Sequence, residues 1–529
     1  LATGASLLAP LRYRPYAFLL PALGAVLSSL VLHHAFRETG GHGVTEVIYS
    51  ISRRGGLLRL RSAFSRLLSS MLTIASGGSA GPEAPVVISG SSIGSNISNI
   101  ADGNDRQRTV MVGCGAAGAI AAIFNAPMAG IAFSMEAILG EWRPVQIVPI
   151  AIASVVATQV SRVLQGNQIP FEHRVFGAGT QDLAFSLGLA LFCAAGAILL
   201  MRMLRLIERN ASRWVAPLFL RAGAGGLLVG ALGMTLPVVL GEGYESIRTA
   251  IAGNFAPGLG IVGACVLAKI AATSLTIGSG GSGGIFAPCI VVGSLVGVFY
   301  RRILMALSLA VPPAGEGYFA LLGMAGLLSS VLQAPLTAIF LIIEITGSYE
   351  IILPVVLVAV VSAAVSQRFE PHSIYHQELV NRGELLRPRT DARVLADLTV
   401  REVASTDVIT LRPDMPLSEV IEILRRSRRT AFPVVEPKDG QYLGMIRTEE
   451  IRGYLFDETL RNSVLVEEIM DPAKVGISPD EELSDIMEKF DELGVDSLPV
   501  VDGNVYVGLI SKVELLEQYR LELIVQEDQ

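Results

Sequence analysis

The chain has 529 residues, of which 51% are hydrophobic and 17% charged, and its formal net charge is −7. Soluble domains carry about 25% charged residues, so a soluble protein is excluded as a description of the whole chain. The small acidic net charge argues against a nucleic-acid partner, which needs a clustered basic face. The four cysteines lie in apolar segments without CxxC spacing, which argues against a zinc site or a disulfide framework.

Apolar residues are concentrated before residue 387. Runs long enough to cross a bilayer, which takes about 20 residues, lie at 16–35, 181–203, 217–240 and 350–367. Shorter runs interrupted by Gly, Pro and Ser lie at 84–97, 116–135, 285–300, 318–332 and 335–346. Short, broken hydrophobic segments are typical of transporters whose helices stop partway across the membrane. Residues 1–386 are therefore predicted to form a mainly α-helical polytopic membrane domain.

Three segments of this domain recur in the same order: 41–43 as 241–243, more weakly than the others, 76–85 as 279–288, and 117–136 as 325–344. The offsets of 200, 203 and 208 residues are nearly equal. The sequence therefore predicts two copies of one fold, about 1–180 and 181–386, and inverted copies place such segments face to face near the bilayer midplane. The counterpart of the run at 181–203 would fall near or before residue 1, so we expect the first copy to lack its opening helix in this numbering.

The loops Gly77–Pro85 and Gly278–Pro288 each lead into an apolar helix near a Pro, a good first-turn residue. A helix N-terminus presents unpaired N–H groups and a positive dipole end, and glycines let the backbone approach an ion. Two such termini brought together predict an anion site. A cation site would instead show carboxylates or carbonyls.

Glu83 is a carboxylate within the first of these loops, where its repeat mate is the apolar Phe286. Ionisable residues at membrane depth are costly and usually functional. A carboxylate beside an anion site can occupy that site and then swing away or take up a proton, which favours Glu83 as a gate. A residue that only caps the first turn of its helix is the alternative.

Beyond residue 387 the composition is that of a soluble domain. The stretch Phe432–Glu436 recurs as Leu498–Asp502, and Tyr442–Ile446 recurs as Tyr506–Ile510. Amphipathic helices precede them at 417–426 and 483–493. The pattern predicts two tandem α/β modules, about 394–456 and 464–520, each ordered strand, helix, strand, strand, helix.

The membrane part resembles the CLC family of chloride channels and proton-coupled chloride exchangers. The family's gating motif Gly-x-Glu-x-Pro is present at Gly81, Pro82 and Glu83, and its motif Gly-x-Phe-x-Pro at Gly284, Ile285 and Phe286; the family's pathway tyrosine resembles Tyr375. The resemblance implies an inverted repeat with broken, re-entrant helices, no enzymatic activity and no cofactor. It also implies a homodimer with one chloride pore in each subunit, where these loops, the N–H groups of Ile285 and Phe286 and the Tyr375 hydroxyl bind the anion. For Tyr375, an interfacial aromatic anchor is the alternative.

Two departures from the family pattern bear on mechanism. The first anion loop, usually Gly-Ser-Gly-Ile-Pro, reads Gly41-His42-Gly43-Val44-Thr45 here, so His42 and Gly43 are the candidates for anion contact and chloride preference over nitrate is open. Family exchangers often carry an inner glutamate where this chain has Ala137. The absence of that carboxylate favours passive conduction. Glu136 and its repeat mate Glu344 are expected to be structural.

The C-terminal modules resemble a CBS pair, which often binds adenine nucleotides such as ATP or AMP. The family's ribose-and-phosphate pattern ends at Ser511 and Glu514 in the second module and at Glu450 in the first, where Arg447 replaces the usual Ser or Thr. A carboxylate can hold ribose hydroxyls. A nucleotide site and a purely structural dimerisation platform both remain open.

The leading hypothesis is a channel-like chloride pathway gated by Glu83 and regulated by the CBS pair, in a lipid bilayer and as a homodimer. A proton-coupled chloride or nitrate antiporter is the alternative. Outside the class of anion transport proteins, the rival hypotheses are a CBS-linked cation transporter, an intramembrane enzyme and a non-conducting scaffold. The CBS pair is expected to be cytoplasmic and the membrane a prokaryotic inner membrane. An arginine cluster between membrane segments fits this orientation: Arg53, Arg54, Arg59 and Arg61.

Overall fold

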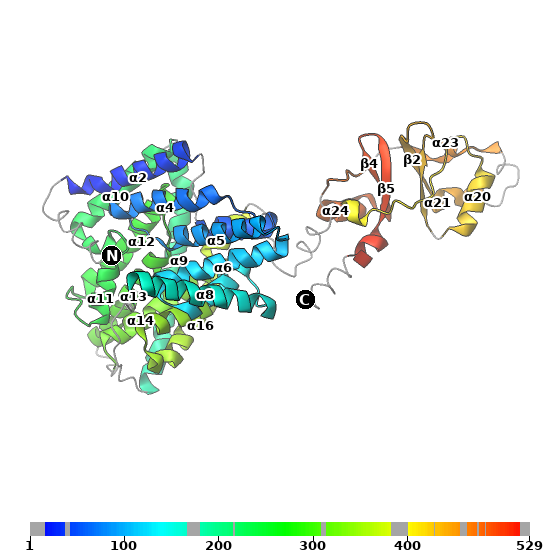
Figure 1. Ribbon diagram of the computed structural model, residues 1–529. Helices are drawn as coiled ribbons and strands as arrows, with labels where there is room; N and C mark the ends of the chain where they lie inside the picture. The colour runs from blue at the N-terminus through cyan, green and yellow to red at the C-terminus, as the bar shows by residue number, and fades with distance from the viewer. Residues whose placement is uncertain are drawn as a thin grey trace. The chain divides into compact units, whose positions relative to one another are not determined.

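The computed structural model describes residues 16–36, 43–166, 180–214, 217–307, 314–381, 400–427, 429–454, 463–472, 476–481 and 483–518. The chain divides into two compact units, Leu1–Leu385 and Leu386–Gln529. In the first, the membrane unit, the regular elements of the described residues are all helices, and the strands in the described part of the chain lie in the second, the C-terminal unit (Figure 1).

The first half of the membrane unit contains α2 (Leu20–Leu30), α3 (Gly43–Arg53), α4 (Leu60–Ala75), α5 (Glu83–Ile100), α6 (Asp105–Phe124), α7 (Pro127–Phe133) and α8 (Pro144–Gln165). The second half contains α9 (Thr180–Trp214), α10 (Leu218–Thr235), α11 (Tyr244–Ile251), α12 (Leu259–Gly278), α13 (Phe286–Ala306), α14 (Glu316–Leu332), α15 (Pro335–Thr346), α16 (Ile352–Phe369) and α17 (Ile374–Asn381). Short 3-10 or π turns lie at Ala17–Leu19, Val31–Ala35, Ser134–Leu139, Pro237–Val239 and Tyr349–Ile351.

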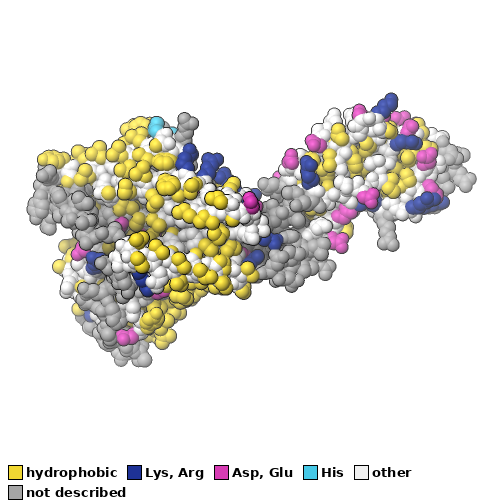
Figure 2. All heavy atoms as spheres, viewed as in Figure 1, with side chains coloured by type: hydrophobic (Ala, Val, Ile, Leu, Met, Phe, Trp, Pro, Cys, Tyr) yellow, Lys and Arg dark blue, Asp and Glu magenta, His cyan; other side chains and the backbone are white. Residues whose placement is uncertain are grey.

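Within the described residues, 8 helices are long and apolar enough to cross a membrane. The predicted runs at 16–35, 181–203, 217–240 and 350–367 overlap four of them, of which Leu218–Thr235 ends before the predicted residue 240. The other spans are Asp105–Phe124, Pro144–Gln165, Leu259–Gly278 and Phe286–Ala306. Shorter apolar helices lie at Pro127–Leu139, Glu316–Leu332 and Pro335–Thr346. Hydrophobic side chains cover much of the face of this unit seen in Figure 2, as expected for a surface that meets lipid.

The two halves are related by contacts that cross between them in reciprocal pairs. The backbone N–H of Ser79 donates to Thr276 Oγ1 at 3.0 Å, and its mate Ser282 donates to Thr73 Oγ1 at 3.3 Å. Reciprocal contacts of this kind are the signature of a two-fold axis. The predicted fold class, a helical membrane protein built from an inverted repeat with broken helices, is confirmed.

Glycines let the central helices cross closely, and they do so at matching places in both halves. A Cβ on Gly94 of α5 would lie 2.0 Å from the Met111 carbonyl oxygen of α6. Its mate Gly297 of α13 would be 1.9 Å from the Phe319 carbonyl oxygen of α14. Helix α14 is buried along almost its whole length, and α13 and α14 lie next to each other in the membrane unit (Figure 1).

The C-terminal unit has two small cores. In one, β1 (Ala431–Val435) pairs antiparallel with β2 (Tyr442–Arg447), which pairs with β3 (Asp471–Pro472); in the other, β4 (Ser497–Asp502) pairs with β5 (Val505–Ser511). The helices are α19 (Val400–Val403), α20 (Leu417–Arg426), α21 (Thr448–Ile451), the turn Arg452–Tyr454, α23 (Val466–Ile469) and α24 (Leu483–Leu493). The register shifts after Val434 in one sheet and after Val500 in the other, so even the irregularity of the strand recurs.

The prediction of a leading strand in each module is wrong for the described residues. Leu411 and Ile477 each form only an isolated parallel bridge, to Val434 and Val500. A single bridge orders one residue pair and does not build a ladder, so the order seen in each module is a helix, a hairpin and a following helix, which is α21 in the first module and residues 512–518 in the second.

Candidate anion site

Two glycine-rich loops, one from each half, meet at the centre of the membrane unit. The Gly81 N–H donates to the Gly284 carbonyl at 2.8 Å, and the Gly284 N–H donates to the Gly81 carbonyl at 2.7 Å. Ser79 reinforces the junction through a hydroxyl contact of 2.9 Å to Thr273. The loops that the sequence repeat predicted to face each other are therefore hydrogen-bonded to each other.

This junction brings the starts of α5 and α13 together. Their N-cap residues, Pro82 and Ile285, make no side-chain capping hydrogen bond. The N-cap side chains therefore leave the first-turn N–H groups of both helices open to another acceptor, and these groups carry the positive end of the helix dipole. Gly284 lies against the start of α5, where an added Cβ would be 3.1 Å from the Ala84 nitrogen.

Two further helices begin beside this point. Gly43, the first residue of α3, packs on α5, where an added Cβ would be 3.1 Å from the Ala84 carbonyl oxygen. Tyr375 lies in the first turn of α17, is 2% exposed and belongs to the same buried core as Ile285 and Phe286. That burial argues against the interfacial-anchor interpretation of Tyr375. His42 lies outside the described residues.

Glu83 is the first residue of α5 and is 1% exposed. Its Oε1 accepts a hydrogen bond of 2.8 Å from the Tyr244 hydroxyl, while its Oε2 is buried without a hydrogen-bond partner among the described residues. The side chain turns back over the loop, because a Cβ on Gly81 would lie 2.0 Å from Oε2. The carboxylate therefore lies over the paired loops, in contact with the place where the two helices begin.

Phe286, the repeat mate of Glu83, is 1% exposed and packs against aromatic rings of the first half. Its ring centroid is 5.3 Å from that of Phe124 and 6.3 Å from that of Phe133. The same position is thus a carboxylate in one copy and an apolar wedge in the other. The ionisable side of the site comes from the first copy.

Glu136 and Glu344 cap helices across the two-fold axis. Glu136 accepts hydrogen bonds from the N–H groups of Leu336 at 3.2 Å and Thr337 at 2.9 Å, at the start of α15. Glu344 accepts from Met128 and Ala129, both at 2.9 Å, at the start of α7. A carboxylate held by two backbone donors at a helix N-terminus is a cap, which supports the structural interpretation. Ala137, next to Glu136, is 3% exposed and faces the core.

Sequence reasoning missed Tyr244 and Lys269. Lys269 lies in the apolar helix α12, is 0% exposed, and donates to the carbonyls of Gly241 at 2.8 Å and Val239 at 3.2 Å. A lone cation within an apolar helix was the signal that could have found it. Tyr244 follows the weakest repeat segment, and its role needs a contact with Glu83 that spans 161 positions in the sequence.

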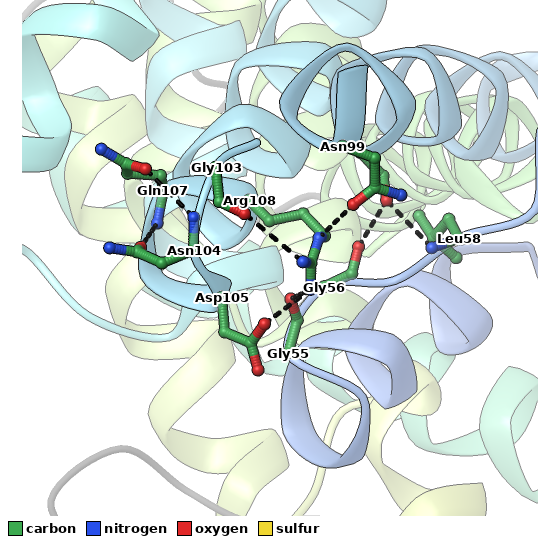
Figure 3. Close-up of polar contacts among 10 residues, drawn as sticks. Gly55, Gly56, Leu58, Asn99, Gly103, Asn104, Asp105, Gln107 and Arg108 are labelled. Carbon is green, nitrogen blue, oxygen red and sulfur yellow. Dashed lines mark hydrogen bonds and ion pairs between the residues drawn. The ribbon is translucent and has the colours of Figure 1, made fainter. Parts of the chain in front are cut away.

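The far ends of α3 and α5 are tied together, which fixes the direction of both helices. Figure 3 shows Arg108 of α6 donating to Asn99 near the end of α5, at 2.7 Å, and to the Gly55 carbonyl after α3, at 3.1 Å. Arg108 also pairs with Asp105 at 2.7 Å, and Asn104 with Gln107 forms a capping box at the start of α6. A guanidinium that bonds two helix ends holds their opposite ends, which face the site, in register.

In the C-terminal unit the predicted nucleotide residues are engaged by the protein itself. Glu514 accepts from Arg429 at 3.1 Å, and the Glu514 N–H donates to Ser511 Oγ at 3.1 Å. Glu450 accepts from the Arg447 N–H at 2.9 Å. Each of these side chains therefore has an internal role that a nucleotide would have to displace or share.

The rings of Tyr442 and Tyr506 stack, with centroids 6.4 Å apart and planes 27° from parallel. Burial raises the pKa of Tyr442 to about 12 and that of Tyr506 further still. Both phenols are therefore neutral at physiological pH, and the pair joins the β2 strand of the first module to the β5 strand of the second.

The fold and site define an inverted-repeat membrane transport protein whose broken helices begin at one buried point. Residues 24–367 match the family described as voltage gated chloride channel, and residues 400–457 and 466–520 each match the CBS domain. The chain therefore belongs to the voltage gated chloride channel family, CLC, and carries tandem CBS domains.

A ClcB-like chloride channel protein of Ralstonia nicotianae is 31% identical over 377 residues, which cover 70% of this chain and 87% of that protein. The H(+)/Cl(-) exchange transporter ClcA of Klebsiella pneumoniae is 30% identical over 365 residues, 67% of this chain and 76% of that protein. The crystal structure of a eukaryotic CLC transporter matches with a TM-score of 0.63 at 19% identity, covering 97% of this chain and 93% of that one, which shows the fold.

Proposed function

We propose that the protein moves chloride across a membrane through a pathway that passes Glu83 and Tyr375. The observation that carries this proposal is the Gly81–Gly284 junction, which aims the uncapped N-termini of α5 and α13 at one buried place. Backbone N–H groups and helix dipoles at membrane depth favour an anion over a cation. Relatives named for chloride transport support the choice of ion.

Glu83 is the gate in this proposal. Its carboxylate carries the same charge as the transported ion and lies against the helix starts that would bind it, so carboxylate and anion compete for one place. Movement or protonation of the side chain opens the pathway. The Ile285 and Phe286 N–H groups, the Tyr375 hydroxyl and the backbone near Gly43 and Pro82 then bind the passing anion.

Passive, channel-like conduction is the first choice of mechanism, and proton-coupled exchange is the second. Ala137 supplies no carboxylate, and its neighbour Glu136 is engaged by the N–H groups of α15, which favours conduction without a proton relay. The 30% identity to an H(+)/Cl(-) exchange transporter is the observation that favours exchange. In that case water carries the proton to Glu83. Selectivity for chloride over nitrate depends on the loop containing His42.

The assembly proposed is a homodimer in a prokaryotic inner membrane, with one pathway in each subunit and the CBS pair in the cytoplasm. The prokaryotic relatives and the arginines between α3 and α4, among them Arg54 and Arg59, support this orientation, because positively charged loops stay on the cytoplasmic side. The CBS pair is proposed as a regulatory platform. The internal engagement of Glu514 by Arg429 favours a structural role over an ATP or AMP site.

The test is a chloride efflux assay in liposomes with external pH recorded at the same time. Chloride efflux without proton movement is expected, and Glu83→Gln should raise it because a neutral side chain competes poorly with an anion. Chloride efflux that drives protons uphill would replace conduction by exchange. An inert protein, correctly folded and equally inert with Glu83→Gln, would overturn the proposed function.

A further inference from the structure

The carboxylate of Glu83 is held from the other half of the molecule by a tyrosine. Tyr244 is the first residue of α11, and its hydroxyl donates to Glu83 Oε1 at 2.8 Å. Among the described residues no other side chain donates to this carboxylate, and the backbone N–H groups of Glu83 and Ala287 also act on it. The Tyr244 hydroxyl is therefore the side-chain group that fixes where the carboxylate lies.

The position of Tyr244 is set by contacts that do not involve Glu83. Gly243, the N-cap of α11, has a φ of +85°, a left-handed conformation that favours glycine, and it turns the chain into the helix at Tyr244. Just before it, the Gly241 N–H donates to the Gly77 carbonyl at 3.2 Å. The same short segment thus carries the donor and is bonded to the loop that carries the acceptor.

Lys269 of α12 anchors the segment that precedes Tyr244. Its ammonium, 0% exposed, donates to the carbonyls of Val239 and Gly241 and interacts electrostatically with Glu242. A buried cation that bonds two carbonyls of one short segment fixes that segment strongly, because either carbonyl left alone would be buried without a donor. Tyr244 is therefore preorganised: it does not need Glu83 to hold its place.

We propose that Tyr244 is a positioning residue for the gate, and that its hydroxyl holds the Glu83 carboxylate in the blocking position. The inference rests on the proposed function, in which Glu83 competes with the anion. Without the hydroxyl, the carboxylate loses a hydrogen bond to a charged group, which is expected to lower the occupancy of the blocking position about tenfold or more. Ring packing, the alternative role, survives in phenylalanine.

The experiment compares chloride efflux from liposomes for the wild-type chain, Tyr244→Phe, Glu83→Ala and the double variant. Tyr244→Phe should raise efflux several-fold and lower the apparent KM for chloride, because the carboxylate competes less well. In the Glu83→Ala background the same change should have no effect, since the acceptor is gone. Tyr300→Phe is the matched control: its ring packs against Phe192 and Phe319, away from the gate, and efflux should not change.

Each result has a distinct meaning. Efflux that responds to Glu83→Ala but is the same with and without the Tyr244 hydroxyl overturns the positioning role of Tyr244 and leaves the role of Glu83 as a gate intact. Equal effects of Tyr244→Phe in both backgrounds also overturn it, because the hydroxyl would then act independently of Glu83. Absence of anion movement in every variant overturns the proposed function instead.

Size-exclusion chromatography in detergent would reveal whether Tyr244→Phe folds. If it does not, a second variant still tests the positioning role of Tyr244. Glu83→Asp keeps the charge and shortens the side chain by one methylene, which moves the carboxylate away from the fixed hydroxyl. Efflux faster than wild type is expected. Efflux equal to or slower than wild type would show that the hydroxyl does not hold the gate.

Discussion

The reciprocal caps of α7 and α15 lead to the most specific prediction about stability. Glu344→Ala removes the carboxylate that accepts from Met128 and Ala129, and Glu136→Ala removes the acceptor of Leu336 and Thr337. In both variants two N–H groups at a helix start lose a charged acceptor from the other half of the molecule. The two changes should therefore have similar costs.

The magnitude follows from the contacts. Loss of a good N-cap costs about 1 to 2 kcal/mol, and a hydrogen bond to a charged group contributes about 1.5 to 3 kcal/mol. With two such bonds on a partly buried carboxylate, the expected cost is about 3 kcal/mol for each variant. For a unit of this size that corresponds to a fall in melting temperature of about 3 to 6 °C.

The assay is thermal melting of the detergent-solubilised protein, followed by the loss of the intact size-exclusion peak. Glu350→Ala, at an exposed site just beyond α15, is the control and should not change the melting temperature. Glu136→Gln keeps an acceptor oxygen and should fall between wild type and alanine. Chloride efflux from the proteins that remain folded should be close to wild type. A normal melting temperature combined with altered efflux would refute the cap and return Glu136 to the transport pathway.

Other predictions concern packing, anchoring and the CBS pair. Gly297→Ala should prevent the close crossing of α13 and α14, because its Cβ would lie 1.9 Å from the Phe319 carbonyl oxygen. The yield of folded protein on size-exclusion chromatography should fall sharply, and a normal yield would contradict the packing argument. Lys269→Met should leave two buried carbonyls without their donor and lower the melting temperature by several degrees. Because the segment before Tyr244 then loses its anchor, chloride efflux should also rise, as it should in Tyr244→Phe. Arg429→Ala should destabilise the CBS pair by about 1 to 2 kcal/mol, because Glu514 loses its partner, and limited proteolysis of the C-terminal unit is the measurement.

Much of the fold could be predicted from the sequence because its signals are local or repeated. The runs at 181–203 and 350–367 are long and apolar, and each lies in a span of the structure. The loops around Gly81 and Gly284 could be paired from the repeat alone, and they are hydrogen-bonded to each other. The bounds of α20 and α24 match the amphipathic windows at 417–426 and 483–493.

The remaining features depend on contacts that no local pattern encodes. Two spans of the structure, 144–165 and 259–278, are not among the runs predicted above; Pro149 lies within the first and Lys269 within the second. Tyr244 reaches Glu83 only because the two halves fold against each other. In the C-terminal unit, Leu411 and Ile477 each form only one bridge to a neighbouring strand, so the predicted leading strand does not form there.

Some repeat mates that are identical in the two halves make reciprocal contacts across the two-fold axis, whereas other repeat mates differ in chemistry. Ser79 and Ser282, and Glu136 and Glu344, make reciprocal contacts and are therefore needed by the symmetric scaffold. At the centre of that scaffold, Glu83 and Phe286 occupy matching positions with opposite chemistry.

Two buried cations at matching positions of the two halves also differ in what they bind. Arg66 of α4 and Lys269 of α12 are repeat mates at an offset of 203, but Arg66 pairs with Glu46 at 3.1 Å whereas Lys269 binds the backbone of the loop that precedes Tyr244. A symmetric frame can hold an ion from two sides, but it cannot by itself make one side a gate. Here a carboxylate from the first copy is hydrogen-bonded by a tyrosine that follows a lysine-anchored loop of the second copy, so in the proposed mechanism the gate and its holder come from different halves.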